Sequence, residues 1–200
     1  MKGTVETVYS TKFMETEYRK LKGENMRLKT VTRYSEDIKA LEKINEEAIP
    51  ASERNTLDDM LSTGAELIGI YAENEPIGFL VIRKYKKICY LAYLAVKQEL
   101  RSNGIGSAAL KVLIAEYSDY QVVVEFEAPT AHSENDDIKL RRKHFYLKNG
   151  FNETGWFTYY DETEFEIGSS VREFDVGGFE EFTEYLSTVI SGHIPKPYQK

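Results

Sequence analysis

The sequence predicts a mixed α/β domain whose central β-sheet has six to seven strands and is flanked by helices. Segments rich in β-branched and aromatic residues alternate along the chain with segments whose apolar residues recur at helical spacing. The 200 residues, 42% of them hydrophobic, can bury one core, and no repeat or low-complexity linker divides them.

The first half of the chain has clear start and stop signals. Ser35 is followed by two acidic residues, the pattern of a helix N-cap, and Pro50 ends that helix. A turn is expected at Glu73–Pro76, between two strand-like segments. The elements expected before residue 97 are a strand at 26–33, a helix at 36–49, a shorter helix within 52–64 closed by Gly64, a hairpin at 65–85 and a strand at 87–96.

The second half repeats this alternation. Asn149 and Gly150 form a pair typical of a left-handed helix C-cap. After the glycines at 104 and 106 we expect a helix, a buried strand at 119–128, a helix at 136–148, an aromatic-rich hairpin at 151–169, a helix at 179–190 and a non-helical tail.

Composition limits the classes of function. The single cysteine, Cys89, excludes an internal disulfide framework, and the three histidines are scattered, so no metal is expected. No apolar segment approaches the roughly 20 residues of a membrane span. We therefore expect a cytoplasmic protein without a membrane partner. Residues 151–190 carry ten acidic residues and one basic residue, which disfavours a nucleic-acid partner and fits either a solvated face or an acidic surface that attracts a cationic substrate.

The segment RSNGIG, residues 101–106, predicts an anion site at the start of a helix. A P-loop would require a lysine after the glycines, and here two alanines follow. A dinucleotide site is the more serious alternative, because Glu125 stands nineteen residues after Gly106. Seven mostly polar residues separate Val96 from Gly104, however, and an antiparallel hairpin follows, so the dinucleotide fold is disfavoured.

A third pattern fits better. Arg101–Gly106 reads R-x-x-G-x-G, and Phe145–Phe151 reads F-Y-x-x-x-G-F. Together, in this order of elements, they resemble the acyl-CoA motifs of the bacterial-type GNAT superfamily of N-acetyltransferases. The resemblance covers residues 26–169 and implies a sheet splayed at the acyl-CoA site. It suggests an N-terminal arm or helix at 1–25, an acyltransferase domain at 26–170 and a C-terminal helical extension and tail at 171–200.

The resemblance implies acetyl-CoA as co-substrate. The pantetheine arm would pair with the strand before the motif, and the pyrophosphate would lie on the backbone N–H groups of the motif. The implied cofactor-binding residues are Leu94, Ala95, Val96, Arg101, Ser102, Asn103, Gly104, Ile105, Gly106 and Ser107. Many relatives carry N-x-x-A before the F-Y pair; Lys139 and Arg142 occupy those positions here, so the asparagine contact is not carried over.

Acetyl transfer to an amine requires a base for the ammonium proton and an acid for the leaving thiolate. The resemblance implies Tyr146 as the acid. We expect Glu125 to be the base, with Glu127, His132 and His144 as alternatives. Some relatives use a glutamate on the preceding strand, but Tyr90 stands near that position.

The predicted function is N-acetyl transfer from acetyl-CoA to a primary amine of a cationic acceptor, a small molecule or a peptide. The helices within 36–61 and the hairpin segment 156–165 would line the acceptor pocket, and homodimer formation is left open. The alternative is a catalytically silent GNAT-fold module that binds CoA as a sensor or docks a partner.

Overall fold

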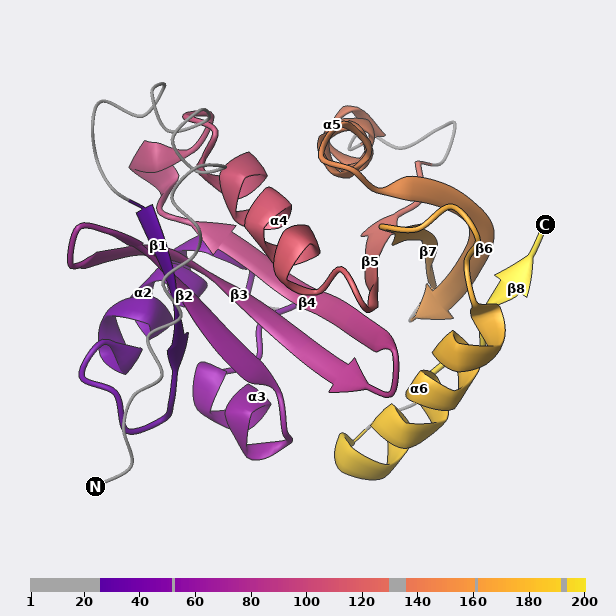
Figure 1. Cartoon of the computed structure of the whole chain (residues 1–200), viewed down its shortest axis with the longest axis horizontal. Helices are drawn as coiled ribbons and strands as arrows, with labels where there is room; N and C mark the ends of the chain where they lie inside the picture. The colour runs from indigo at the N-terminus through magenta and orange to yellow at the C-terminus, as the bar shows by residue number, and fades with distance from the viewer. Residues whose placement is uncertain (1–25, 52, 130–135, 161, 192–193) are drawn as a thin grey trace. The chain divides into compact units, whose positions relative to one another are not determined.

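The computed structural model describes residues 26–51, 53–129, 136–160, 162–191 and 194–200 (Figure 1). The arm or helix expected at residues 1–25 lies outside them. Along the chain the elements are β1 (Met26–Val31), α2 (Ile38–Ala48), α3 (Leu57–Ser62), β2 (Glu66–Ala72), β3 (Glu75–Tyr85), β4 (Ile88–Val96), the 3₁₀ turn η1 (Gln98–Leu100), α4 (Ile105–Glu116), β5 (Gln121–Glu127), α5 (Asp136–Lys148), β6 (Asn152–Tyr160), β7 (Thr163–Ser169), α6 (Val176–Val189) and β8 (Tyr198–Gln199).

The mixed α/β architecture is confirmed. The strands are hydrogen-bonded in the order β1-β2-β3-β4-β5-β7-β6-β8, with β4 and β5 parallel. Eight strands exceed the expected six to seven because β8, in the tail, pairs with β6 through Trp156 opposite Gln199 and Phe157 opposite Tyr198. A two-residue strand has no periodicity to read and forms only where a partner edge is available.

The described chain forms two compact units. One consists of the residues up to Val81 together with Tyr93–Ala109, and the other of Ile82–Ala92 together with Leu110–Lys200. Strands β3 and β4 and helix α4 contribute residues to both units. None of the described helices has the length and apolar character needed to cross a bilayer.

In the first unit, β1 pairs antiparallel with β2 from Met26 opposite Ala72 to Val31 opposite Leu67. Helix α2 begins at Ile38, later than the expected start after Ser35. The Ser35 hydroxyl accepts a hydrogen bond from the backbone N–H of Thr32 at 3.0 Å, so it closes a turn and does not cap the helix.

The short helix α3 forms as expected. The Thr56 hydroxyl accepts a hydrogen bond from the N–H of Asp59 at 3.1 Å, which satisfies one unpaired donor of the first turn. Gly64 follows the helix with a φ of +82°. The hairpin turn lies at Glu73 and Asn74, because β3 begins at Glu75 and includes Pro76.

In the second unit, β5 and β6 pair antiparallel with β7, and helices cover both faces of these strands (Figure 1). Helix α6 packs through Phe179, Phe182 and Leu186 on a cluster that includes Val123 of β5. It begins at Val176 and not at Phe179, because the Asp175 carboxylate accepts a hydrogen bond from the N–H of Gly178 at 2.9 Å. Two glycines in its first turn have low helix propensity, so the sequence pattern does not indicate that the helix begins here.

Helix α5 ends where the sequence predicts. Gly150 has a φ of +99°, the left-handed conformation of a C-cap glycine. The Asn149 side chain donates a hydrogen bond to the carbonyl of Phe145 at 2.7 Å, and the N–H of Phe151 donates to the carbonyl of Tyr146 at 3.3 Å. These bonds satisfy the last carbonyls of the helix and direct the chain into β6.

Phe182→Ala should destabilise the second unit by about 3–5 kcal/mol, because it removes a fully buried ring from the contact between α6 and the sheet. Urea unfolding monitored by circular dichroism measures this loss. Ser187→Ala, an exposed position on the same helix, is the matched control and should change the free energy of unfolding by less than about 0.5 kcal/mol. Equal effects of the two substitutions would contradict the packing described for α6.

Candidate functional site

Within the described part of the chain, the glycine-rich segment places backbone N–H groups at the start of α4 ahead of the helical hydrogen-bond ladder. The first hydrogen bond at this helix start runs from the N–H of Ala108 to the carbonyl of Gly104 at 2.9 Å. The N–H groups of Ile105, Gly106 and Ser107 therefore precede the first donor of the helical ladder. Such donors, together with the helix dipole, favour an anion.

The chain enters this helix through two left-handed residues. Ser102 has a φ of +65° and Gly104 a φ of +86°. Apart from the chain neighbours of Gly104, no atom of the described residues lies within 4 Å of the position that a Cβ there would occupy. The positive φ, and not crowding by these residues, therefore favours the glycine. Ser102 adopts a conformation that costs a non-glycine residue free energy, a feature often found at binding sites.

Arg101 is tied to the end of β4. Its Nε donates a hydrogen bond to the carbonyl of Val96 at 3.1 Å, across the turn formed by η1. This contact holds the glycine-rich segment against the strand before it. The charge that Arg101 would offer to a pyrophosphate stays a prediction, as does every cofactor contact expected from Leu94 to Ser107.

The parallel pairing of β4 and β5 is short. It joins Ile88–Tyr90 to Gln121–Val123. Strand β5 continues to Glu127 and over that length pairs with β7, while β4 continues to Val96. The ladder between the two strands therefore covers only these three residue pairs.

Glu125 is surrounded by hydroxyl groups. Its carboxylate accepts hydrogen bonds from the hydroxyls of Tyr90 at 2.7 Å, Tyr160 at 3.5 Å and Thr158. Burial raises the pKa of Glu125 above its ordinary value of 4.5, and the three hydroxyl donors act in the opposite direction. Burial and the neighbouring Glu125 carboxylate raise the pKa of Tyr160.

Tyr146 lies on α5 within a group of aromatic rings. It stacks on Phe126 with ring centroids 5.8 Å apart and meets the rings of Phe145 and Phe151 edge to face. Burial raises the pKa of Tyr146 to about 12, although the positive charge of Arg142 acts to lower it. Tyr146 therefore holds its proton at neutral pH.

The two predicted catalytic residues are placed on opposite faces of β5. Side chains alternate along a strand, so Val123 and Glu125 share one face and Phe126 points to the other. Val123 packs in the cluster with α6, whereas Phe126 contacts Tyr146 of α5. Glu125 and Tyr146 are thus separated by the strand.

The alternative bases have other environments. Glu127 pairs with Lys139 at 3.2 Å and with Arg142 at 3.4 Å. The basic side chains at the two positions that depart from the family motif therefore balance the negative charge of this carboxylate. His144 is exposed on α5. His132 lies outside the described residues.

The hydroxyl partners of Glu125 on β6 were not predicted from the sequence. Thr158 and Tyr160 stand two residues apart on one strand face, a signal visible in the sequence. The residues around Thr158 and Tyr160 do not indicate that this strand face lies beside Glu125. The pairing of β6 and β7 places Thr158 opposite Phe165, and that of β5 and β7 places Glu125 opposite Ile167, which brings the groups together.

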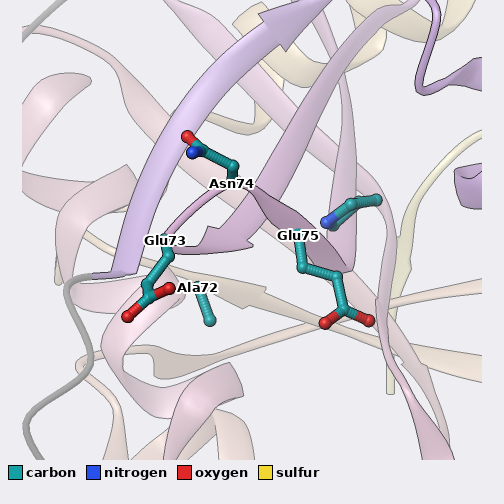
Figure 2. Close-up of a pocket in the computed structure, with 5 residues that line it drawn as sticks. Ala72, Glu73, Asn74 and Glu75 are labelled. Carbon is teal, nitrogen blue, oxygen red and sulfur yellow. The ribbon is translucent and has the colours of Figure 1, made fainter.

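A surface hollow lies at the turn between β2 and β3, lined by Ala72–Pro76. Figure 2 shows the carboxylates of Glu73 and Glu75 extending away from the side chain of Asn74. Glu75 pairs with Lys97 at 2.5 Å, and Arg27 donates to the Asn74 side chain at 2.7 Å, so these contacts brace the hairpin. No cluster of His, Cys, Asp and Glu suited to a metal occurs among the described residues.

Comparisons with known proteins bear on the family and the fold. Residues 64–153 match a family model described as an acetyltransferase (GNAT) domain. The comparison with curated protein sequences finds no match.

Several solved structures share the fold. A putative GNAT-family acetyltransferase from Bacteroides thetaiotaomicron is 21% identical, with a TM-score of 0.68 over 84% of this chain and 99% of that one. A GNAT-family acetyltransferase from Elizabethkingia anophelis, solved with acetyl-CoA bound, is 20% identical, with a TM-score of 0.54 over 72% and 97%. The ribosomal-protein-S18-alanine N-acetyltransferase from Escherichia coli is 16% identical, with a TM-score of 0.56 over 72% and 92%. The motifs, the family match and the shared fold together identify residues 64–153 as an acetyltransferase domain of the GNAT family.

Proposed function

We propose that this protein is an N-acetyltransferase that moves the acetyl group of acetyl-CoA to a primary amine. The observation that supports the proposal is the start of α4 within the matched GNAT domain, where backbone donors follow two left-handed residues, an arrangement suited to an anion. The pyrophosphate of CoA is the ligand proposed for those donors, from Ser102 to Ser107. The pantetheine arm is assigned to Leu94–Val96, and no metal takes part.

Glu125 is the proposed base. An alkyl amine has a pKa near 10 and arrives as an ammonium ion, so a proton must leave before the nitrogen attacks. A carboxylate with a raised pKa accepts a proton more readily than an exposed one. The hydroxyls of Tyr90, Thr158 and Tyr160 donate hydrogen bonds to the Glu125 carboxylate and hold its orientation. They contact the same carboxylate oxygens that would accept the proton.

Tyr146 is the proposed acid. Complete proton transfer from a phenol of pKa about 12 to a thiolate whose conjugate acid has a pKa near 8.5 is uphill by about 5 kcal/mol. The main role proposed for Tyr146 is therefore to donate a hydrogen bond to the sulfur as negative charge develops there. The amine nitrogen and the sulfur are bonded to the same carbon during attack, whereas Glu125 and Tyr146 lie on opposite faces of β5. Glu125 is therefore proposed to accept the ammonium proton through bridging water.

The proposed acceptor is cationic because a primary amine is protonated at neutral pH. The acidic segment 151–190 gives less support than its composition suggests. Five of its carboxylates are paired with lysines from outside the segment: Glu153 and Glu166 with Lys143, Glu164 with Lys200, Glu181 with Lys86 and Glu184 with Lys196. The choice between a small-molecule and a peptide amine, and a cytoplasmic location, stay predictions.

The enzyme should release free thiol from acetyl-CoA only when an amine acceptor is added. A colorimetric thiol assay against a panel of polyamines, aminoglycosides, amino acids and peptides measures this release. Binding of acetyl-CoA by calorimetry without thiol release from any amine would favour the alternative, a CoA-binding module without chemistry.

Tyr146→Phe should lower kcat by about 10²–10⁴, the usual scale for a positioned acid, and leave KM for acetyl-CoA near the parent value. The substitution keeps the aromatic packing and removes only the hydroxyl. Tyr34→Phe, at a side chain that is 88% exposed, is the matched control. If Tyr146→Phe is as active as the parent, Tyr146 is a packing residue.

Glu125→Gln should lower kcat/KM for the amine by about 10²–10⁴ and remove the acidic limb of the pH–rate profile. In the parent that limb should lie above pH 4.5, since burial raises the pKa of Glu125. The same shift makes the parent lose folding stability as the pH rises from 4.5 to the folded pKa, and Glu125→Gln should abolish this loss. Glu127→Gln on the same strand is the control, and an equal effect there would reject Glu125 as the base.

A further inference from the structure

Strand β3 approaches β4 unusually closely at Gly78. A Cβ added to this glycine would lie 2.5 Å from the carbonyl oxygen of Ala95 and 3.2 Å from the Cα of Val96. Both atoms belong to the backbone, so no side-chain rotation would relieve the contact. In a regular sheet, Cβ atoms project away from the pleat while carbonyls point within the sheet toward the neighbouring strand. The β4 backbone at Ala95 therefore leaves this arrangement and occupies the space above Gly78.

Two hydrogen bonds hold the β4 backbone immediately after Ala95. The N–H of Lys97 donates to the carbonyl of Ile77 at 2.9 Å, so β4 is bound to β3 again immediately after Val96. The carbonyl of Val96 accepts the hydrogen bond from Arg101 at 3.1 Å. The close approach of the β4 backbone to Gly78 thus lies at Ala95 and Val96, immediately before the Lys97 contact with Ile77 and the turn that leads to the glycine-rich segment.

We propose that Gly78 is a positioning residue of the acyl-CoA site, and that its missing side chain lets the backbone of Ala95 and Val96 adopt the displaced geometry that binds the pantetheine arm. This inference rests on the proposed function, because it assumes that CoA is the ligand. In this proposal Gly78 acts through the backbone of the strand beside it and not through a contact of its own with the ligand. A glycine in a strand interior weakens that strand, so its presence there fits a close approach of another backbone.

The test compares two ligands that share the pyrophosphate. CoA carries the pantetheine arm, and ADP does not. Gly78→Ala should weaken CoA binding roughly tenfold, the scale of one or two lost hydrogen bonds, and leave ADP binding unchanged in calorimetry. In kinetics, KM for acetyl-CoA should rise by a similar factor while kcat at saturation stays close to that of the parent.

Two control variants separate the possible causes. Gly69→Ala, in the interior of β2, places its new methyl group 2.6 Å from the ring of Tyr71, which is a side chain and not the β4 backbone. It should leave the affinities for both ligands unchanged. Gly104→Asp places a negative charge at the start of α4 and should weaken the binding of both CoA and ADP. Gly104→Ala is its control, because it introduces only the strain of a side chain at positive φ.

Each outcome is decisive. Selective loss of CoA affinity in Gly78→Ala supports the proposal. Equal loss for CoA and ADP, unchanged affinity for both, or failure of Gly78→Ala to fold while Gly69→Ala folds would overturn it, because Gly78 would then serve the sheet in general. If Gly104→Asp binds both ligands like the parent, the proposed phosphate site is itself wrong, which is a separate failure.

Discussion

The alternation of side chains along β5 determines how the chemistry-bearing residues are distributed. Glu125 points to the face on which α6 packs, and Phe126 points to the face on which Tyr146 of α5 packs. A shift of one residue in the pairing of β5 with β7 would exchange the two faces. The register that places Glu125 opposite Ile167 therefore fixes which group faces which side, and the burial that holds Ile167 in the core protects that register.

Helix α6 contributes to the surroundings of Glu125 although it lies beyond residues 64–153. The ring of Tyr90 lies 5.3 Å from that of Phe182, and the Tyr90 hydroxyl donates to Glu125. The apolar contact limits the positions that the Tyr90 ring can adopt, and the hydrogen bond orients the carboxylate. The C-terminal extension therefore supports the packing of the proposed base, and the hydroxyl cluster depends on the same contacts that stabilise the second unit.

The departure from the family motif on α5 has a structural counterpart. Lys139 and Arg142 replace the N-x-x-A pattern, and both pair with Glu127 at the end of β5. Lys143 of α5 pairs with Glu153 of β6 and Glu166 of β7. These ion pairs connect α5 to β5, β6 and β7. The pairs Lys139–Glu127 and Lys143–Glu166 are partly enclosed, so their charges are less screened than those of exposed pairs.

The sequence by itself determined the elements and motifs that depend on neighbouring residues. The left-handed glycines, the cap at Asn149–Gly150, the short helix after Thr56 and the donors at the start of α4 follow from backbone conformation over a few positions. The alternating pattern likewise predicted the mixed sheet. The helix starts predicted for α2 and α6 were wrong where one short polar side chain set the boundary: Ser35 accepts a hydrogen bond from Thr32 outside α2, and Asp175 caps α6 at Gly178.

Only the tertiary structure decided which distant groups meet. Glu125 lies 33 residues from Thr158 along the chain and 35 from both Tyr90 and Tyr160, and strand register alone brings them together. The bond from Arg101 to Val96, the contact between Gly78 and Ala95, and the pairing of β8 with β6 likewise depend on how strands are placed side by side. Local propensity carries no information on register, because every register preserves the same backbone conformation and differs only in the packing of side chains from remote strands.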